Sequence, residues 1–529
     1  MASYSYIIKN GTIIDGAGFP MAKGDIGISG EIIKAIGPGK LSGATRVIDA
    51  KGKYIMPGVV DITNHSDTHW TLFHAPSQES MLMQGITTIL GGVCGSSLAP
   101  LTDARAIRAI QKWVDVSTIN INWKSTGEFF DELGRHNIGV NFGTLVGHGT
   151  LRRDIAGDDP RELTKEELES MKLLLRRSLD EGAMGLSLGL ATSHGRTVSQ
   201  EEIIGLSKVV AETGKIISIH LRNEGRRLLS SVVEIVNIAR ATGAKVHAAH
   251  FKAIGKKAWS DLPKALTIIQ KAREEEKLDI TIDFFPYLRT GSLLYTMLPE
   301  WILEGGKERI MEMLTDQSKR ESILESIGRM TLHFDNITIA EARRDKHSIG
   351  KTILQIAESS GLTPEETLIQ LLIVNDLVVT IFGKTLSSRN LVAIAKEPYS
   401  IFGSDGVGQD NTTAAHKTDL THPRSYGAVP RFLNRLSKQN NILSWEDSIK
   451  KLTSGPASRL GLEKTRGMLK KGYFADIVIF DPETIKDTAT YSDPYQAPVG
   501  IDYVFINGHC AIEKGKATGA LAGKILRQG

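Results

Sequence analysis

The sequence has 529 residues, of which 41% are hydrophobic and 23% charged, a composition typical of a soluble globular protein. Its net charge of only +4 gives no sign of the basic surface that a nucleic-acid-binding protein needs. Two cysteines argue against a disulfide scaffold and fit a reducing cytoplasm. The N-terminus lacks a secretory-signal pattern, and no run reaches the roughly 18 apolar residues of a membrane helix. We therefore expect a packed cytoplasmic enzyme or binding protein with no membrane partner.

Both ends of the chain are rich in predicted strands. Residues 5–56 give short β-branched runs separated by turns, and Asn10-Gly11 is a typical hairpin signal. Residues 466–515 show the same pattern. The ends, 1–56 and 466–529, are therefore predicted to form one small β-domain, in which Cys510 packs.

Between the ends, short apolar runs alternate with charged segments that have helical spacing. Eight of the runs have the length of buried strands: 58–63, 85–90, 138–148, 182–190, 215–221, 244–251, 279–285 and 399–405. Eight parallel strands with helical crossovers are the number that closes a (β/α)₈ barrel, so residues 57–465 are predicted to form this α/β fold. A doubly wound open sheet is the alternative.

Residues 293–398 are too long for a single connection between two strands. Three segments in this stretch have helical patterns: 299–314, 350–361 and 363–376. They predict an inserted helical subdomain before the last strand.

Residues with metal-binding side chains follow several of the predicted strands, where a barrel carries its catalytic groups. They are His65, Asp67, His69, Cys94, His148, His220, His250 and Asp405. A lone histidine at such a place is more often hydrogen-bonded, and a lone cysteine is more often a small buried residue. Together they favour a metal site, because imidazole, thiolate and carboxylate are the ligand types that zinc accepts.

Cys94, His220 and His250 would supply three ligands and leave one position open for water, as in a catalytic zinc site. Beside such a water Asp405 would accept a proton and later return it to the leaving group, whereas alone it would cap a turn. Lys252 lies two residues past His250, so the alternation along a strand puts both on one face. Lys252 or Arg424 would hold a substrate carboxylate, although in isolation each would be an exposed charge.

These motifs resemble the N-acyl-D-amino-acid deacylases of the amidohydrolase superfamily over nearly the whole chain. The specific matches are GGVCGSSLAP, HLRNEG and HFK, whereas PG-x-x-D and G-x-x-AD-x-V point only to the superfamily. The resemblance implies a metal-dependent barrel with a small β-sandwich built from both termini. It places one tightly bound zinc ion on Cys94, His220 and His250, and the catalytic carboxylate on Asp405.

The same resemblance suggests which residues bind the substrate. Lys252 and Arg424 match the family's substrate-carboxylate residues. Tyr287 and Ser292 match a PYxxGS segment if one extra residue is allowed.

One departure from the superfamily concerns a second metal ion. The H-x-H motif after the first strand is replaced by Thr63-Asn64-His65, so its first histidine is missing. A hydroxyl is a much poorer zinc ligand than imidazole, which favours a single metal ion. His65 is then either a remaining weak ligand or a hydrogen-bonding residue.

The resulting hypothesis is zinc-dependent hydrolysis of N-acyl-D-amino acids, which are small molecules. His148 would orient a pocket group or the oxyanion, or else form a hydrogen bond at the barrel rim. The alternatives are a cyclic amide substrate, as in dihydroorotases and hydantoinases, a dipeptide, or a catalytically silent binding or assembly protein. The missing histidine favours the silent protein, and the presence of all three ligands and Asp405 argues against it. Neither the acyl group nor the oligomeric state follows from the sequence.

Overall fold

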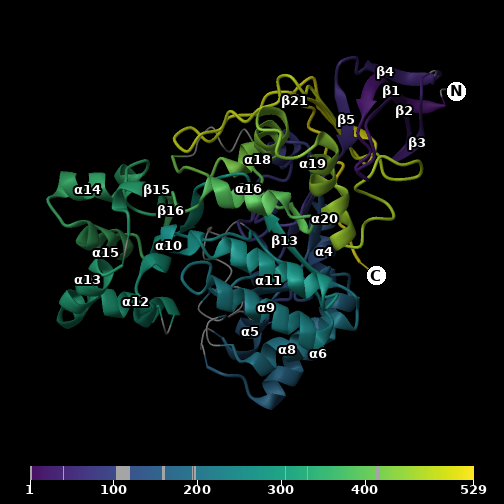
Figure 1. Cartoon of the computed structure of the whole chain (residues 1–529). Helices are drawn as coiled ribbons and strands as arrows, with labels where there is room; N and C mark the ends of the chain where they lie inside the picture. The colour runs from purple at the N-terminus through teal and green to yellow at the C-terminus, as the bar shows by residue number, and fades with distance from the viewer. Residues whose placement is uncertain are drawn as a thin grey trace.

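The structure is a computed structural model that describes residues 3–39, 41–102, 119–157, 161–192, 195, 198–303, 306–330, 332–410 and 418–528. Three regions are visible: strands from both termini at one end, a central part of strands and helices, and an insertion at the opposite end (Figure 1). Among the described residues, no helix has the length and apolar content needed to cross a membrane.

Strands from the two chain ends belong to one nine-stranded sheet. The N-terminal strands are β1 (Tyr4–Ile13), β2 (Ala22–Ser29), β3 (Ile32–Gly37), β4 (Ala44–Asp49) and β5 (Tyr54–Pro57). The C-terminal strands are β18 (Ile477–Phe480), β19 (Ile501–Ile506), β20 (His509–Glu513) and β21 (Lys516–Ala517). Their order is β21-β20-β19-β18-β5-β1-β2-β3, with β4 beside β1. β5 joins the two ends, because it pairs with both β1 and β18.

The predicted hairpin turn at Asn10-Gly11 is wrong. β1 runs through both residues, and its register against β2 shifts between Ile8 and Gly11, as in a β-bulge. Asn10 has a φ of 63°, a left-handed conformation that asparagine tolerates better than most residues. The tolerance of asparagine for a left-handed conformation, which predicted a turn, therefore produces a bend in a continuous strand.

Each of the eight predicted runs in the middle of the chain contains a strand. These strands are β6 (Val59–Asp61), β7 (Ile86–Gly91), β8 (Asn141–Thr144) with β9 (Val146–Gly147), β10 (Gly185–Gly189), β11 (Ile216–His220), β12 (Lys245–Ala248), β13 (Ile280–Phe284) and β17 (Ser400–Phe402). They form two parallel sheets, ordered β6-β7-β8 and β17-β13-β12-β11-β10-β9. One residue separates β8 from β9, and a parallel bridge joins Asn64, after β6, to Gly406, after β17.

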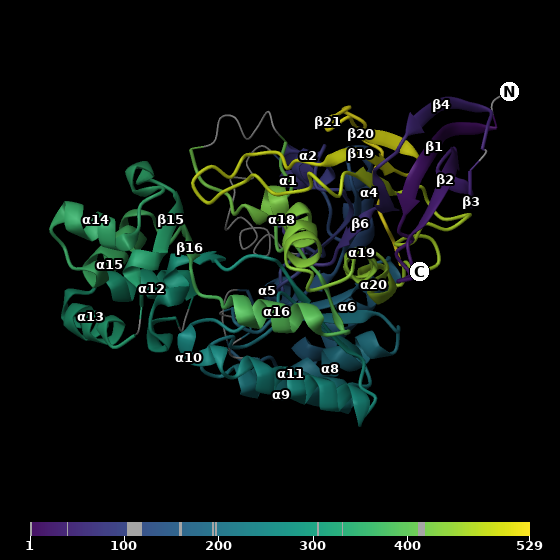
Figure 2. The same ribbon diagram turned by 45° about the horizontal axis from the view of Figure 1, so that its top comes forward.

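Helices connect these strands, and from α5 to α16 they pack against one another in chain order. They are α4 (Thr126–Arg135), α5 (His148–Ala156), α6 (Lys165–Asp180), α8 (Gln200–Ala211), α9 (Leu228–Thr242), α11 (Leu262–Glu274) and α16 (Ser388–Lys396). Figure 2 shows α8, α9, α11 and α16 on one side of the central strands. α6 begins at a capping box, in which the Thr164 hydroxyl accepts from Glu167 N and the Glu167 carboxylate accepts from Thr164 N.

The remaining central helices are short or follow the last strand. Three single turns occur early: α1 (Thr71–His74), α2 (Glu79–Leu82) and α10 (Lys256–Trp259). After β17 come α18 (Arg424–Phe432), the π-helical η6 (Leu433–Gln439), α19 (Trp445–Leu452) and α20 (Ser454–Arg459). The chain then returns to the terminal sheet.

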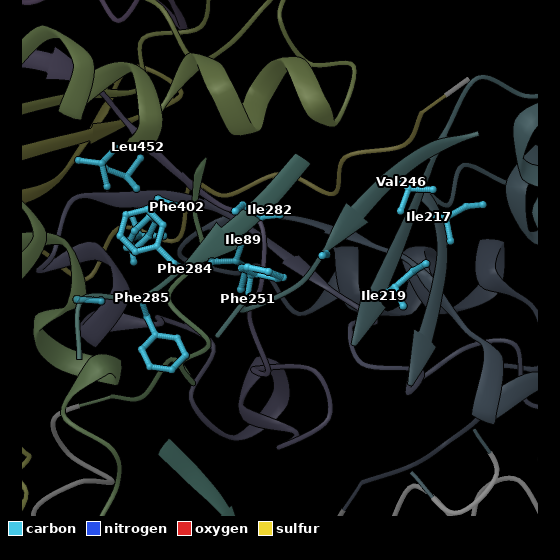
Figure 3. Packing of buried hydrophobic residues seen from close by; sticks show 14 of the residues in the cluster. Ile89, Ile217, Ile219, Val246, Phe251, Ile282, Phe284, Phe285, Phe402 and Leu452 are labelled. Atoms are coloured by element: carbon cyan, nitrogen blue, oxygen red, sulfur yellow. The ribbon is translucent and has the colours of Figure 1, made fainter. Parts of the chain in front are cut away.

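The central strands are buried on both faces: one face is apolar, and the other also carries polar side chains such as Ser218 of β11 and His247 of β12, which pair in register. Ile217 and Ile219 of β11 pack with Val246 of β12 in the large cluster between strands and helices (Figure 3). Ile216 belongs to a second cluster on the other face. Because side chains alternate along a strand, His220 at the end of β11 lies on the same face as Ile216.

The insertion contains a sheet that the sequence patterns did not predict. Its strands are β14 (Thr290–Leu293), β15 (Ile337–Ala342) and β16 (Val379–Gly383), paired antiparallel in the order β14-β16-β15. Its helices are α12 (Gly306–Thr315), α13 (Arg320–Gly328), α14 (Ile353–Ser360) and α15 (Pro364–Val374), with the short 3₁₀ turns η1 (Leu294–Met297), η2 (Glu300–Ile302), η3 (Gln317–Lys319), η4 (Phe334–Asn336) and η5 (Lys346–Ser348).

The prediction of a purely helical insertion over 293–398 is therefore corrected at two points. β15 and β16 are short runs with β-branched residues, ITIAEA and VTIFG, which a search for helical spacing does not detect. α16 contacts α11 and β13, so it is a crossover helix of the central region. The insertion has its own apolar cluster, which includes Ile339, Leu368 and Ile381.

Candidate metal centre

The structure brings Cys94, His220 and His250 together from three different strand ends. One ligand atom from each lies within 4.8 Å of the others. Cys94 Sγ is 3.2 Å from His250 Nε2, and the two imidazole rings are 4.3 Å apart at an interplanar angle of 82°. Cys94 follows β7, His220 ends β11 and His250 follows β12, so the shared direction of the parallel strands causes this convergence.

The backbone is strained at three site residues. Cys94, His250 and Asp405 have positive φ angles of 54°, 38° and 53°, which cost about 1–3 kcal/mol each for residues with side chains. Hydrogen bonds hold two of them in place: His250 N donates to Asp283 Oδ1 at 2.9 Å, and Asp405 N donates to Thr63 O at 2.8 Å. The fold thus maintains the conformations that direct these side chains.

The charges of the cluster favour a thiolate at Cys94. Burial alone would raise the pKa of this thiol, but the charge of His250 and hydrogen bonds with His220, His250 and His65 hold it well below its usual value. Burial and Lys252 lower the pKa of His250, but the charges of Cys94 and Asp405 outweigh them and raise it well above its usual value. Thiolate and imidazole are zinc ligands, so the donor set fits a zinc ion with one position left open.

Asp405 lies beside this cluster with two partners. Its Oδ1 is 3.0 Å from His65 Nε2, and its Oδ2 is 2.5 Å from Arg424 Nη1. Burial favours the neutral carboxyl group, but the charges of Arg424 and His250 and the hydrogen bond with His65 hold the pKa of Asp405 well below its usual range. Burial also disfavours charged His65, but its bonds to Asp405 and Cys94 raise the pKa of His65 to about 10. Asp405 is therefore ionised.

Thr63, at the position of the missing histidine, makes a different contact. Its hydroxyl donates to Asp283 Oδ2 at 2.7 Å, and the same carboxylate oxygen lies 2.8 Å from His247 Nε2. Thr63, Asp283 and His247 are all fully buried. The hydroxyl thus belongs to a buried polar network behind His250.

Glu224 is a site residue that the sequence analysis missed. Its Oε1 lies 2.6 Å from Lys252 Nζ and 3.3 Å from His250 Nδ1, and its Oε2 lies 3.8 Å from His220 Nε2. Burial raises the pKa of its carboxyl group, but the charges of Lys252 and His220 outweigh burial and lower it to about 2. The position of Glu224 within HLRNEG, four residues after His220, is the signal that could have identified it.

The structure places Tyr287 beside the backbone of Arg424, but it places Ser292 elsewhere. The Tyr287 hydroxyl donates to Pro423 O at 3.2 Å. The Ser292 hydroxyl lies 3.0 Å from Thr296 Oγ1, whereas a methyl group added at Gly291 would lie 3.6 Å from Arg424 Nη2. The extra residue in the motif therefore puts Gly291, not the serine, next to Arg424, because successive residues of β14 face opposite sides.

His148 belongs to a separate buried network. Its Nε2 lies 2.7 Å from Glu202 Oε1, and Arg152 Nη1 lies 3.1 Å from Glu202 Oε2. All three side chains are at most 3% exposed. This geometry corresponds to the hydrogen-bonding alternative for His148.

Comparisons with known proteins agree with this geometry. A model of the amidohydrolase family matches residues 46–293 and 409–512. The chain is 28% identical to a D-aminoacylase of Alcaligenes xylosoxydans xylosoxydans, over 99% of this chain and 97% of the relative. It is 29% identical to an N-acyl-D-glutamate deacylase of the same organism, over 99% and 96%.

A solved structure matches the whole fold. It is an N-acyl-D-glutamate deacylase from Bordetella bronchiseptica, complexed with zinc and a phosphonate inhibitor that mimics the tetrahedral intermediate of its reaction. The TM-score is 0.83 at 28% identity, with 99% of this chain and all of the other covered. The α/β fold expected from the sequence is therefore an amidohydrolase fold. The chain belongs to the amidohydrolase family, the metal-dependent hydrolases of amide bonds.

Proposed function

We propose that this protein hydrolyses the amide bond of N-acyl-D-amino acids with one zinc ion held by Cys94, His220 and His250. The convergence of these three ligands beside the ionised Asp405 carries the proposal. The relatives that match the whole chain support the substrate class, because their names describe deacylation of N-acyl-D-amino acids.

When bound, zinc supplies a Lewis acid that polarises the acyl carbonyl and lowers the pKa of water toward about 7. Asp405 accepts the proton of the attacking water and returns it to the leaving amine. His65 holds the Asp405 carboxylate in place from one side through its 3.0 Å contact.

Arg424 is the proposed anchor of the substrate carboxylate, because its guanidinium lies within 2.5 Å of Asp405 and suits a bidentate grip. Tyr287 supports it by fixing the backbone at Pro423. Ser292 and His148 have no part in this mechanism, since their side chains have partners outside the cluster.

A single zinc ion is proposed because Thr63 offers no imidazole and its hydroxyl is engaged by Asp283. His65 then acts as the partner of Asp405, to which its Nε2 is already bonded. A second metal ion would have to break the hydrogen bond between His65 and Asp405, and it would gain only the His65 imidazole as a ligand.

We also propose that the two parallel sheets form one (β/α)₈ barrel over residues 57–465. The single-residue step from β8 to β9 and the bridge between Asn64 and Gly406 support closure. The terminal segments, 1–56 and 466–529, would form the small β-sandwich, supported by the cluster that Ile8 and Ile26 share with Phe505.

The proposal is tested by metal analysis and a substrate panel on one preparation. We expect one zinc per chain, turnover of N-acetyl-D-amino acids, and loss of both zinc and turnover in Cys94→Ala. Absence of stoichiometric metal with unchanged deacylation in Cys94→Ala would overturn the mechanism. Turnover confined to cyclic amides or dipeptides would overturn the substrate class. Bound zinc without turnover of any amide would indicate a binding protein instead.

A further inference from the structure

Glu224 is a buried carboxylate that lies against both proposed histidine ligands. Its side chain is 7% exposed, and its two oxygens reach His250 Nδ1 at 3.3 Å and His220 Nε2 at 3.8 Å. The opposite nitrogen of His250, Nε2, lies 3.2 Å from Cys94 Sγ. The His250 ring is therefore held between Cys94 on one side and Glu224 on the other.

The turn after β11 places Glu224 at this position. Asn223 Oδ1 accepts hydrogen bonds from Gly225 N and Arg227 N, and Asn223 N donates to the Ser231 hydroxyl at the start of α9. Glu224 O in turn accepts from Ile254 N at 2.7 Å, which ties this turn to the loop after β12. Both histidine-bearing strands are thus connected through the backbone of Glu224.

Lys252 compensates for the charge of Glu224. Its ammonium group donates to Glu224 Oε1 at 2.6 Å and to His250 O at 2.9 Å, and it lies 2.8 Å from His250 Nδ1. In this structure Lys252 therefore contacts Glu224 and His250, whereas Arg424 is the cation beside Asp405.

We infer that Glu224 is a positioning residue that orients His250 toward the metal ion from outside the ligand set, an inference that rests on the proposed function. A carboxylate next to the non-ligating nitrogen of a histidine fixes its tautomer and ring orientation and makes it a better ligand. Here the carboxylate lies at His250 Nδ1, opposite the nitrogen that faces Cys94, and the Lys252 ammonium pairs with it in a buried place.

The test is the zinc affinity of Glu224→Gln, measured by competition with a chelator. We expect the affinity to fall about 10–100-fold, because loss of such a carboxylate typically has this effect. The absorption spectrum of the cobalt-substituted protein should shift as well, since the histidine orientation changes. Glu234→Gln is the matched control. Glu234 of α9 pairs with Arg222 in the turn after β11, and it contacts neither histidine.

Thermal melting of the zinc-free proteins shows whether each variant is folded. Wild-type zinc affinity and cobalt spectrum in a folded Glu224→Gln protein would overturn the inference, as would an equal loss of affinity in Glu234→Gln. If the wild type itself binds no zinc, the proposed function fails, so the two failures are distinguishable. If Glu224→Gln is unfolded without zinc, Glu224→Asp replaces it. We expect weaker zinc binding, because the shortened side chain moves its carboxylate away from His250 Nδ1, and wild-type affinity would overturn the inference.

Discussion

Asp405 is held by a cation on one side and a hydrogen-bonded histidine on the other. Arg424 and His65 both favour the ionised carboxylate, so this side chain is ready to accept a proton rather than to donate one. A substrate carboxylate bound to Arg424 would compete with Asp405 for the guanidinium. In the proposed mechanism Asp405 would therefore couple substrate binding to proton transfer.

Replacing Asp405 by Asn removes the proton acceptor and retains the size of the side chain. We expect kcat to fall about 10²–10⁴-fold, the contribution typical of general acid–base catalysis. Zinc content should stay at the wild-type value, because Asp405 is not among the proposed ligands. Asp481→Asn, which affects a pair with Lys53 and the turn after β18, should leave kcat unchanged. Wild-type kcat in Asp405→Asn would show that another group transfers the proton.

The two cysteines should differ in their reaction with iodoacetamide. Neighbouring histidines hold the pKa of Cys94 well below its usual value, whereas burial and nearby Glu513 raise the pKa of Cys510 to about 11. Because the thiolate is the reactive form, zinc-free protein at pH 7 should be labelled at Cys94 first. Labelling of Cys510 should increase about tenfold per pH unit up to pH 11, since its thiolate fraction does so.

Zinc should protect Cys94 from this reaction if the thiolate is a ligand. Peptide mass analysis before and after chelation distinguishes the two cysteines. Equal labelling of Cys94 with and without zinc would contradict its role as a ligand.

At the scale of elements, one residue in a short strand changes which side chain faces the site. β14 presents Gly291 toward Arg424, while Ser292 bonds to Thr296. Period-two alternation makes this arrangement sensitive to a single insertion, because every later side chain moves to the opposite face. The insertion sheet thereby determines which residue lies next to Arg424.

Ser292→Ala should leave the KM for N-acyl amino acids unchanged, because the serine hydroxyl lies outside the cluster. Gly291→Ser should lower KM, because a hydroxyl near Arg424 adds a hydrogen-bond donor for the substrate carboxylate. The added Cβ has only ordinary contacts, the nearest at 3.6 Å, so the strand accommodates it. Steady-state kinetics test both variants. A raised KM in Ser292→Ala would place the serine in the binding site after all.

At the scale of the whole molecule, the C-terminal segment ties the terminal sheet to the central strands. Gly523 N donates to Ile138 O, Phe142 N donates to Lys524 O, and Leu526 N donates to Phe142 O, at 2.7–2.9 Å. The buried Lys215 ammonium donates to Gln528 O at 2.7 Å. The segment thus forms an additional edge along β8.

Deletion of residues 520–529 should destabilise the protein by at least about 2–6 kcal/mol, since the four hydrogen bonds named above contribute roughly 0.5–1.5 kcal/mol each. The deletion also removes further bonds, such as the one from Asn507 Nδ2 to Ala522 O. The melting temperature measures the loss. Leu521→Ala is the control, because this side chain is 40% exposed and should have little effect. A truncated protein that melts with the wild type would show that the segment is not part of the folded core.

Hydrophobic periodicity and local motifs were sufficient to predict the eight central strands, the β-rich ends and three side chains that the structure brings together. These features depend on residues that are neighbours in the chain. A short apolar run of strand length predicts a buried strand, and a polar group that directly follows a parallel strand lies at the edge of the sheet where the strands end. The geometry around Cys94, His220 and His250 is consistent with that reasoning.

Other features depend on contacts between residues far apart in the sequence. Glu224 meets Lys252, Thr63 bonds Asp283, and the bulge at Asn10 exists only because β2 pairs with β1. Charge pairing, side-chain direction and strand register are set when separate segments pack, and no local pattern encodes them. For this reason the proposed ligands could be predicted from the chain alone, while their buried charged partners became evident only in the folded molecule.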